Sequence, residues 1–288
     1  MRRLAPPLHI FSDVFDVCTG SIGNGLKIQD FQLIRATIIA DGFQYSTLAN
    51  TSSLYTLAPN PNPDDTVIYG NITKGDLRGL YTGQLRPRKK PGRTIYDQLI
   101  SLAPLGRCPF CGFGQSRSLD HYLPHSFHPI YSVLPQNLVP CCGDCNGIKN
   151  NNVAVIEDEQ TIHPYYDQAI FFSEQWLFAQ VVPGNDISIT YYVAPPNHWT
   201  DTNKNRVKHH FETYELDTRF SIEAANELVS LISSLKLLST PIPADSQIVE
   251  VELRREFTNE SLLHINSWKT AMYQALMTNA WFCGGGYM

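Results

Sequence analysis

Two Cys-x-x-Cys pairs are the residues whose type and spacing predict chemistry most specifically: Cys108 and Cys111 in CPFCG, and Cys142 and Cys145 in CCGDCN. Such a turn directs two thiolates into one tetrahedral zinc site, with bond lengths of about 2.3 Å. Four thiolates leave no open coordination position, so this zinc would be structural. The alternatives are buried free cysteines or a thioredoxin-like redox site, which the absence of a βαβ pattern disfavours. Cys141 is interpreted as a packing residue.

The 30 residues between the two pairs exceed the roughly 15–20 that are usual in a zinc ribbon, so a structured insert is expected. This insert contains SLDHYLPHSF, which places Asp120 beside His121. Residue alternation predicts strands at 116–124 and 137–141, and GDCNGIKNN can open a helix. Neighbouring side chains on a regular strand point to opposite faces. For Asp120 and His121 to serve one site, either the strand is distorted or the groove is wide, and both options stay open.

This pattern resembles the HNH nucleases of the ββα-metal class. The resemblance rests on the first cysteine pair, then DHYLPHS, then NLVPCCGDCNGIK, in the order of that family's core. It implies that His121 is the general base that takes a proton from the attacking water. It further implies that Asp120 and Asn146 hold one Mg²⁺ or Mn²⁺, and that Asn137 braces the loop and orients His121. The family often has His at the position of Asn146, and an amide oxygen suits a hard cation such as Mg²⁺.

The residue types fit the activity that the resemblance implies, which is hydrolysis of DNA to 5′-phosphate and 3′-hydroxyl ends. Phosphodiester cleavage needs a base with a pKa near neutral and a cation beside the phosphate. Lys149 follows Asn146 by one helical turn and is either a phosphate contact or a solvated lysine. His125 and His128 belong to the loop between the strands, where either could touch metal or DNA, although a place on the loop surface is the expectation. His163 in IHPYYD is expected to pack on the core rather than stack on a base.

Charge is distributed unevenly along the chain. Residues 71–120 hold nine Lys or Arg and three acids, whereas residues 151–288 hold eight and seventeen. A basic segment in a chain of net charge −5 indicates an anionic partner, although a solvated basic loop is the simpler interpretation. Under the nuclease hypothesis, the stretch RPRKKPGR would contact the DNA backbone independently of sequence. Its basic residues are Arg86, Arg88, Lys89, Lys90 and Arg93.

The segments that flank the core resemble a bacterial HNH subgroup, some of whose members accompany ATPases in anti-phage defence systems of the Septu type. This resemblance implies an ATPase partner and a role in defence. Two other functions are considered: a zinc-stabilised nucleic-acid-binding module without activity, and a nuclease that cuts RNA with the same site. The intact Asp120, His121, Asn137 and Asn146 argue against the first, and no stacking-rich RNA motif supports the second.

The expected fold class is α+β, with an HNH core at 94–152 between largely helical extensions at 1–93 and 153–288. No apolar run approaches the roughly 18 residues of a membrane span, and the start of the chain lacks the apolar core of a signal peptide, so a cytoplasmic protein is expected. Outside the core the pattern predicts strands at 8–15, 169–182 and 186–194, and helices at 26–45, 74–85, 94–104, 203–216, 221–238 and 259–282.

Overall fold

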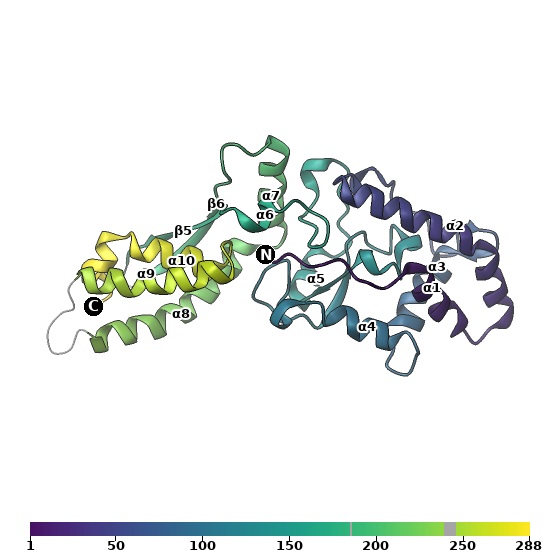
Figure 1. Ribbon diagram of the computed structural model, residues 1–288, viewed down its shortest axis with the longest axis horizontal. Coiled ribbons are helices and arrows are strands. Elements are labelled where there is room, and N and C mark those ends of the chain that lie inside the picture. The colour runs from purple at the N-terminus through teal and green to yellow at the C-terminus, as the bar shows by residue number, and fades with distance from the viewer. Residues whose placement is uncertain (185, 239–245) are drawn as a thin grey trace. The chain divides into compact units, whose positions relative to one another are not determined.

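The computed structural model describes residues 1–184, 186–238 and 246–288, and the chain divides into two compact units. The N-terminal unit is Arg2–Asp167, and the C-terminal unit is Gln168–Met288 together with Met1. Helices and small antiparallel two-stranded sheets build both units, which confirms the α+β class (Figure 1). Apart from Met1, the predicted regions 1–93 and 94–152 both fall inside the N-terminal unit. Within the described part of the chain, no helix has the length and apolar character needed to cross a membrane.

The N-terminal unit begins with two helices that form its apolar core. Phe15 of the first helix packs edge-on against Phe31 of the second, and both side chains are buried. A π-helical turn, Leu80–Leu85, continues the third helix, so the helical prediction for 74–85 is confirmed. The regular elements of this unit are α1 (Phe11–Gly20), α2 (Gly25–Asn50), β1 (Val67–Tyr69), β2 (Ile72–Thr73), α3 (Lys74–Gly79), α4 (Arg93–Ile100), β3 (Ser118–His121), β4 (Leu138–Cys141) and α5 (Gly143–Lys149).

The strand predicted at 8–15 is wrong, because this segment enters helix α1 at Phe11. The buried positions of α1 include Phe11, Val14, Phe15 and Cys18. Their spacing of three and four residues is that of one helix face, which a short apolar run does not separate clearly from strand alternation.

The segment between the cysteine pairs folds as an antiparallel hairpin followed by a helix, as predicted. Strand β3 pairs with β4 from Ser118↔Cys141 to His121↔Leu138 without a register shift. Helix α5 starts after Cys142, whose sulfur accepts a hydrogen bond from the Cys145 backbone N–H at 3.4 Å. It ends at Lys149 because Asn150 adopts a positive φ of 46°, which Asn tolerates better than most residues.

The C-terminal unit is built on the hairpin of β5 and β6, which contacts helices α8 and α10 (Figure 1). Residues 170–173, predicted as the start of a strand, form a short helix instead. Trp176 is buried before β5, and its indole N–H donates to the Phe171 carbonyl. The elements of this unit are α6 (Ile170–Ser173), β5 (Leu177–Val182), β6 (Ser188–Val193), α7 (Asp201–Thr213), α8 (Leu216–Leu238), α9 (Ser246–Leu263) and α10 (Trp268–Met277).

The long helix predicted at 259–282 is interrupted between α9 and α10. Asn266 is buried at the break, and its side-chain oxygen accepts hydrogen bonds from the backbone N–H groups of Trp176 and Leu177. Ser267 then caps α10 by accepting from the Thr270 N–H. The interruption therefore serves a tertiary contact with a segment about 90 residues earlier, which helical periodicity does not reveal.

Candidate functional site

The four predicted zinc ligands converge in the N-terminal unit. The sulfurs of Cys108, Cys111, Cys142 and Cys145 all lie within 4.8 Å of one another, and all four residues are buried. Sulfurs bound tetrahedrally at about 2.3 Å from zinc are roughly 3.8 Å apart, and Cys111 Sγ lies 3.9 Å from Cys142 Sγ. The group therefore fits a structural zinc site.

The surroundings of these sulfurs favour thiolates held by a cation. The Gly114 N–H donates to Cys111 Sγ at 3.4 Å. Burial raises the pKa of the Cys108 thiol, so four thiolates this close would need the positive charge of a metal ion to stay deprotonated together. Cys141 stays outside the cluster: it is fully buried, and its sulfur lies 3.4 Å from Ser118 Oγ. The interpretation of Cys141 as a packing residue is thus consistent with its surroundings.

His121 ends strand β3 and is held in one orientation. Its Nε2 donates to the Ser132 carbonyl at 2.8 Å, which leaves Nδ1 as the unprotonated acceptor of the neutral ring. Burial, and next the neighbouring His125, lower the pKa of His121 well below its usual value. The neutral form, which a general base needs, therefore prevails at physiological pH.

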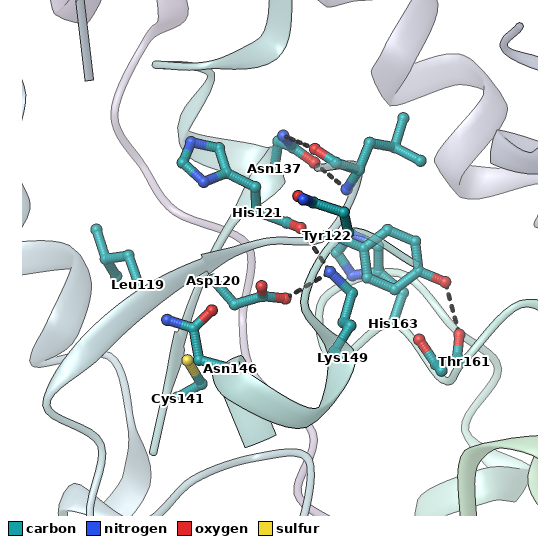
Figure 2. Close-up of polar contacts among 12 residues, drawn as sticks. Leu119, Asp120, His121, Tyr122, Asn137, Cys141, Asn146, Lys149, Thr161 and His163 are labelled. Atoms are coloured by element: carbon teal, nitrogen blue, oxygen red, sulfur yellow. Dashed lines mark hydrogen bonds and ion pairs between the residues drawn. The ribbon is translucent and has the colours of Figure 1, made fainter. Parts of the chain in front are cut away.

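Asp120 points away from the His121 ring, toward helix α5 (Figure 2). Its Oδ2 lies 2.9 Å from the Lys149 ammonium, and both side chains are only 4% exposed. Apart from this ion pair, Oδ2 has no hydrogen-bond partner in the described chain. Burial raises the pKa of Asp120, and Lys149 opposes that shift.

Lys149 is neither a solvated lysine nor an open phosphate contact, the two roles that the sequence suggested. Instead of lying in solvent or on an open phosphate-binding surface, its buried ammonium bridges Asp120 and the His121 carbonyl, to which it donates at 2.6 Å. It thereby ties α5 to the end of β3. The charge of this pair was readable from the sequence, but its burial was not.

Asn146 lies beside Asp120 on the first turns of α5 (Figure 2). Its Nδ2 donates to Ser118 Oγ at 3.4 Å, which leaves the amide oxygen available to a ligand. A carboxylate and an amide oxygen at one place are hard donors of the kind that Mg²⁺ and Mn²⁺ bind. The residues present therefore fit a divalent cation.

Asn137 makes the loop-bracing hydrogen bonds that were predicted. Its fully buried amide accepts from the Leu123 N–H at 2.7 Å and donates to the carbonyls of Leu123 and Tyr131. Tyr45 of α2 donates to the same amide oxygen at 3.1 Å. The loop that carries the Ser132 carbonyl, the partner of His121, is thus closed at its base.

A cleft of about 280 Å³ brings the predicted residues together. Asp120, His121 and Asn146 all line it, although the β3 pairing is regular. A groove at the end of the strand, rather than a distortion of the strand, therefore lets neighbouring residues reach one space. His125 also lines the cleft, with its ring centroid 4.4 Å from that of His121. The loop-surface position that the sequence favoured for His125 is therefore wrong, and the less favoured alternative, a place at the site, fits its position better.

The basic stretch 86–93 is only partly free. Arg86 is exposed and lines the cleft, and Arg88 and Lys89 are exposed as well. Lys90 instead donates to the Ser21 carbonyl, and Arg93 forms an ion pair with Asp97. Three of the five predicted DNA contacts thus remain accessible, and two hold the segment in place.

The two remaining histidines considered in the sequence analysis, His128 and His163, are buried and pack against aromatic rings. His163 is buried with its ring 4.1 Å from that of Tyr122 and its Nε2 3.2 Å from the Tyr45 hydroxyl, in agreement with the predicted packing role. His128, which was expected on the surface, is buried beside Tyr131.

The fold and site define an α+β protein with a buried four-cysteine centre and an adjoining cleft of polar and titratable side chains. The chain is 35% identical to Protein ea31 of Escherichia phage lambda over an alignment of 296 residues, which covers 99% of this chain and 100% of that protein. The chain therefore belongs to the family of this phage protein. No model of a known protein family and no solved structure matches it.

Proposed function

We propose that this protein is a metal-dependent endonuclease of the HNH type that hydrolyses DNA phosphodiester bonds. The observation that carries the proposal is the cleft in which His121, with Nε2 fixed to Ser132, lies with Asp120 and Asn146. A base of fixed tautomer in one cleft with two oxygen donors for a cation is what single-metal phosphodiester hydrolysis requires.

Each residue has a distinct role in this proposal. The Nδ1 atom of His121 takes a proton from the attacking water, while the Nε2–H bond to Ser132 keeps the ring oriented. Asp120 and Asn146 would hold one Mg²⁺ or Mn²⁺, which supplies compensation for charge on the phosphate and the leaving oxygen when it is bound. Asn137 fixes the loop that presents the Ser132 carbonyl, and the four cysteines of the cluster would hold a zinc ion at the base of the hairpin.

Arg86 lines the cleft, and Arg88 and Lys89 follow it closely in the sequence and are exposed. These side chains can neutralise backbone phosphates, which supports DNA as the substrate. RNA cleavage by the same residues is the second candidate. Participation in anti-phage defence with an ATPase partner stays a prediction from the HNH resemblance. The relative is a protein of phage lambda, so members of this family occur in a phage.

Plasmid nicking with Mg²⁺ or Mn²⁺ tests the catalytic assignment. Replacing His121 with Ala should lower the rate at least about 100-fold, the lower end of what a general base contributes. The same substitution at His198, which is 69% exposed in the C-terminal unit, should leave the rate unchanged.

Both variants should remain folded and keep their zinc. His198→Ala should melt at nearly the temperature of the wild type, whereas His121→Ala, which loses a buried ring, should melt lower. Equal nicking by wild type and His121→Ala would end the assignment of His121. A wild type that cuts neither plasmid nor single-stranded RNA, yet binds DNA, would favour the inactive binding module.

A further inference from the structure

His125 occupies a position that the proposed reaction does not yet use. Its ring is half-buried in the wall of the cleft, 4.4 Å from the His121 ring and 5.9 Å from the Tyr81 ring, measured between centroids. It lies four residues after His121, in the loop that follows β3. It is therefore next to the group that would activate water.

Arg78 fixes the protonation pattern of His125. The Arg78 Nε–H donates to His125 Nδ1 at 3.3 Å, and guanidinium offers donors only. Nδ1 must accordingly be the unprotonated nitrogen, and the ring proton sits on Nε2. Asp64 holds Arg78 in turn, with both carboxylate oxygens 2.6 Å from its Nη1.

The same contacts limit what His125 can do chemically. A proton added at Nδ1 would break the Arg78 bond and place two cations side by side, and burial together with Arg78 lowers the pKa of His125 to about 4. His125 is therefore no proton acceptor at neutral pH. Proton donation would leave an imidazolate, which is equally unfavourable. The remaining role is that of a neutral hydrogen-bond donor, fixed in advance, at Nε2.

We propose that His125 Nε2 donates a hydrogen bond to a non-bridging oxygen of the scissile phosphate, with Arg78 and Asp64 as the residues that position it. The inference rests on the proposed nuclease function, because it places the phosphate in the cleft between His121 and Asp120. The exposed Arg86 on the same cleft wall adds positive charge suited to an anionic ligand. A prearranged donor of this kind is most effective where charge develops during the reaction.

A spectroscopic titration tests this contact without any variant. In protein with nitrogen-15-labelled histidine, thymidine 3′,5′-bisphosphate is added to the wild type with its zinc in place and without Mg²⁺ or Mn²⁺. The His125 Nε2–H resonance should shift downfield with saturation, while the ring keeps its Nε2-protonated tautomer. A His125 resonance that does not respond while other cleft resonances do would overturn the proposal, and so would an Nδ1-protonated ring.

Two substitutions then measure the contribution to the reaction. His125→Phe keeps the flat ring without a donor, and His125→Gln restores a donor amide near the position of Nε2. Loss of one oxyanion-type donor costs about 100- to 1000-fold in kcat, so His125→Phe should fall by that factor with little change in KM. His125→Gln should recover at least tenfold of the loss.

Equal kcat for the two variants would overturn the donor role. Should the wild type cut nothing, the nuclease proposal fails by itself, and the bisphosphate titration still decides whether His125 binds a phosphate.

Discussion

At the residue scale, the site depends on the different surroundings of two adjacent residues, the carboxylate of Asp120 and the neutral imidazole of His121. Asp120 is paired with Lys149 in a buried environment, whereas His121 is neutral and bonded to a backbone carbonyl. A buried carboxylate without a partner would be very unfavourable, so Lys149 makes it possible for Asp120 to stay ionised near the cleft. The carboxylate of Asp120 thus has two roles: it stabilises the fold through the ion pair with Lys149, and it is a ligand of the proposed cation site.

Removing the positive member of this pair should destabilise the fold strongly. Lys149→Met leaves a buried carboxylate unpaired, and we expect a loss of about 3–5 kcal/mol in the free energy of unfolding. Urea titration followed by circular dichroism measures it. Lys208→Met, at a lysine 67% exposed, should change stability by less than about 0.5 kcal/mol.

A double variant separates charge from packing in this pair. Asp120→Asn together with Lys149→Met removes both charges, so it should recover a large part of the loss. If Lys149→Met were as stable as the wild type, the ion pair would have no structural role, and the original phosphate-contact hypothesis would regain support.

His128 should make the fold sensitive to acid. Burial lowers its pKa to about 4 in the folded protein, whereas an unfolded histidine titrates near 6.5. As the pH falls from 7 to 5, the unfolded chain therefore binds a proton that the folded chain does not, and stability falls by about 2 kcal/mol from this residue. The free energy of unfolding is not reduced by this residue well above pH 6.5. The reduction grows as the pH falls from 6.5 toward 4.

The variant His128→Phe, which keeps a ring beside Tyr131, isolates this effect. Its stability should decline less than that of the wild type by about 2 kcal/mol between the two pH values, as measured by urea midpoints. Parallel pH profiles for the two proteins would show that His128 titrates normally in the fold.

At the element scale, the hairpin and helix were predictable because their sequence is locally consistent. The cysteine pairs, the strand alternation around Leu119 and the helix opening after Cys142 all point to one arrangement. The helix at Phe11 and the break at Asn266 were missed because burial against distant segments decided them. For the same reason, the inward position of His125 depends on Arg78, 47 residues away, and no short window contains both.

Two adjacent cysteines offer a matched test of the metal centre. Cys142 belongs to the sulfur cluster, and Cys141 does not. Cys142→Ser should therefore lose most of one zinc equivalent per chain and lower the melting temperature, whereas Cys141→Ser should keep the metal. Atomic absorption on purified variants measures this. Zinc lost from both variants or from neither would refute the assignment of the four ligands.

Gly114 should be essential to the same centre for steric reasons. A Cβ at this position would lie 2.8 Å from both Cβ and Sγ of Cys142, closer than real contacts allow. Gly114→Ala should therefore displace a ligand and weaken zinc affinity by roughly tenfold or more, measured by competition with a chromogenic chelator. Gly143→Ala, where a Cβ would meet nothing within 4 Å, is the control, and equal affinities would contradict the crowding argument.

At the scale of the whole molecule, chemistry and charge are divided between the two units. The four zinc ligands and every residue of the cleft belong to Arg2–Asp167. Residues 2–167 contain 14 basic and 14 acidic residues, whereas residues 168–288 contain eight basic and 13 acidic ones. The chain's net charge of −5 thus arises in its C-terminal part, which would repel a polyanion at low salt.

A fragment of residues 1–167 should therefore fold, bind one zinc and hold DNA at least as tightly as the whole chain. The fragment contains a hydrophobic core made from its own residues, which include the buried Phe15, Phe31, Ile38 and Tyr45. Filter binding of a labelled duplex at two salt concentrations, with the fragment 168–288 as the control, measures the affinity and its salt dependence.

Under the proposed function the 1–167 fragment also nicks plasmid DNA. A fragment that binds zinc and DNA but does not cut would assign a catalytic requirement to the C-terminal unit, whereas a zinc-free, unfolded fragment would show that the two units fold only together.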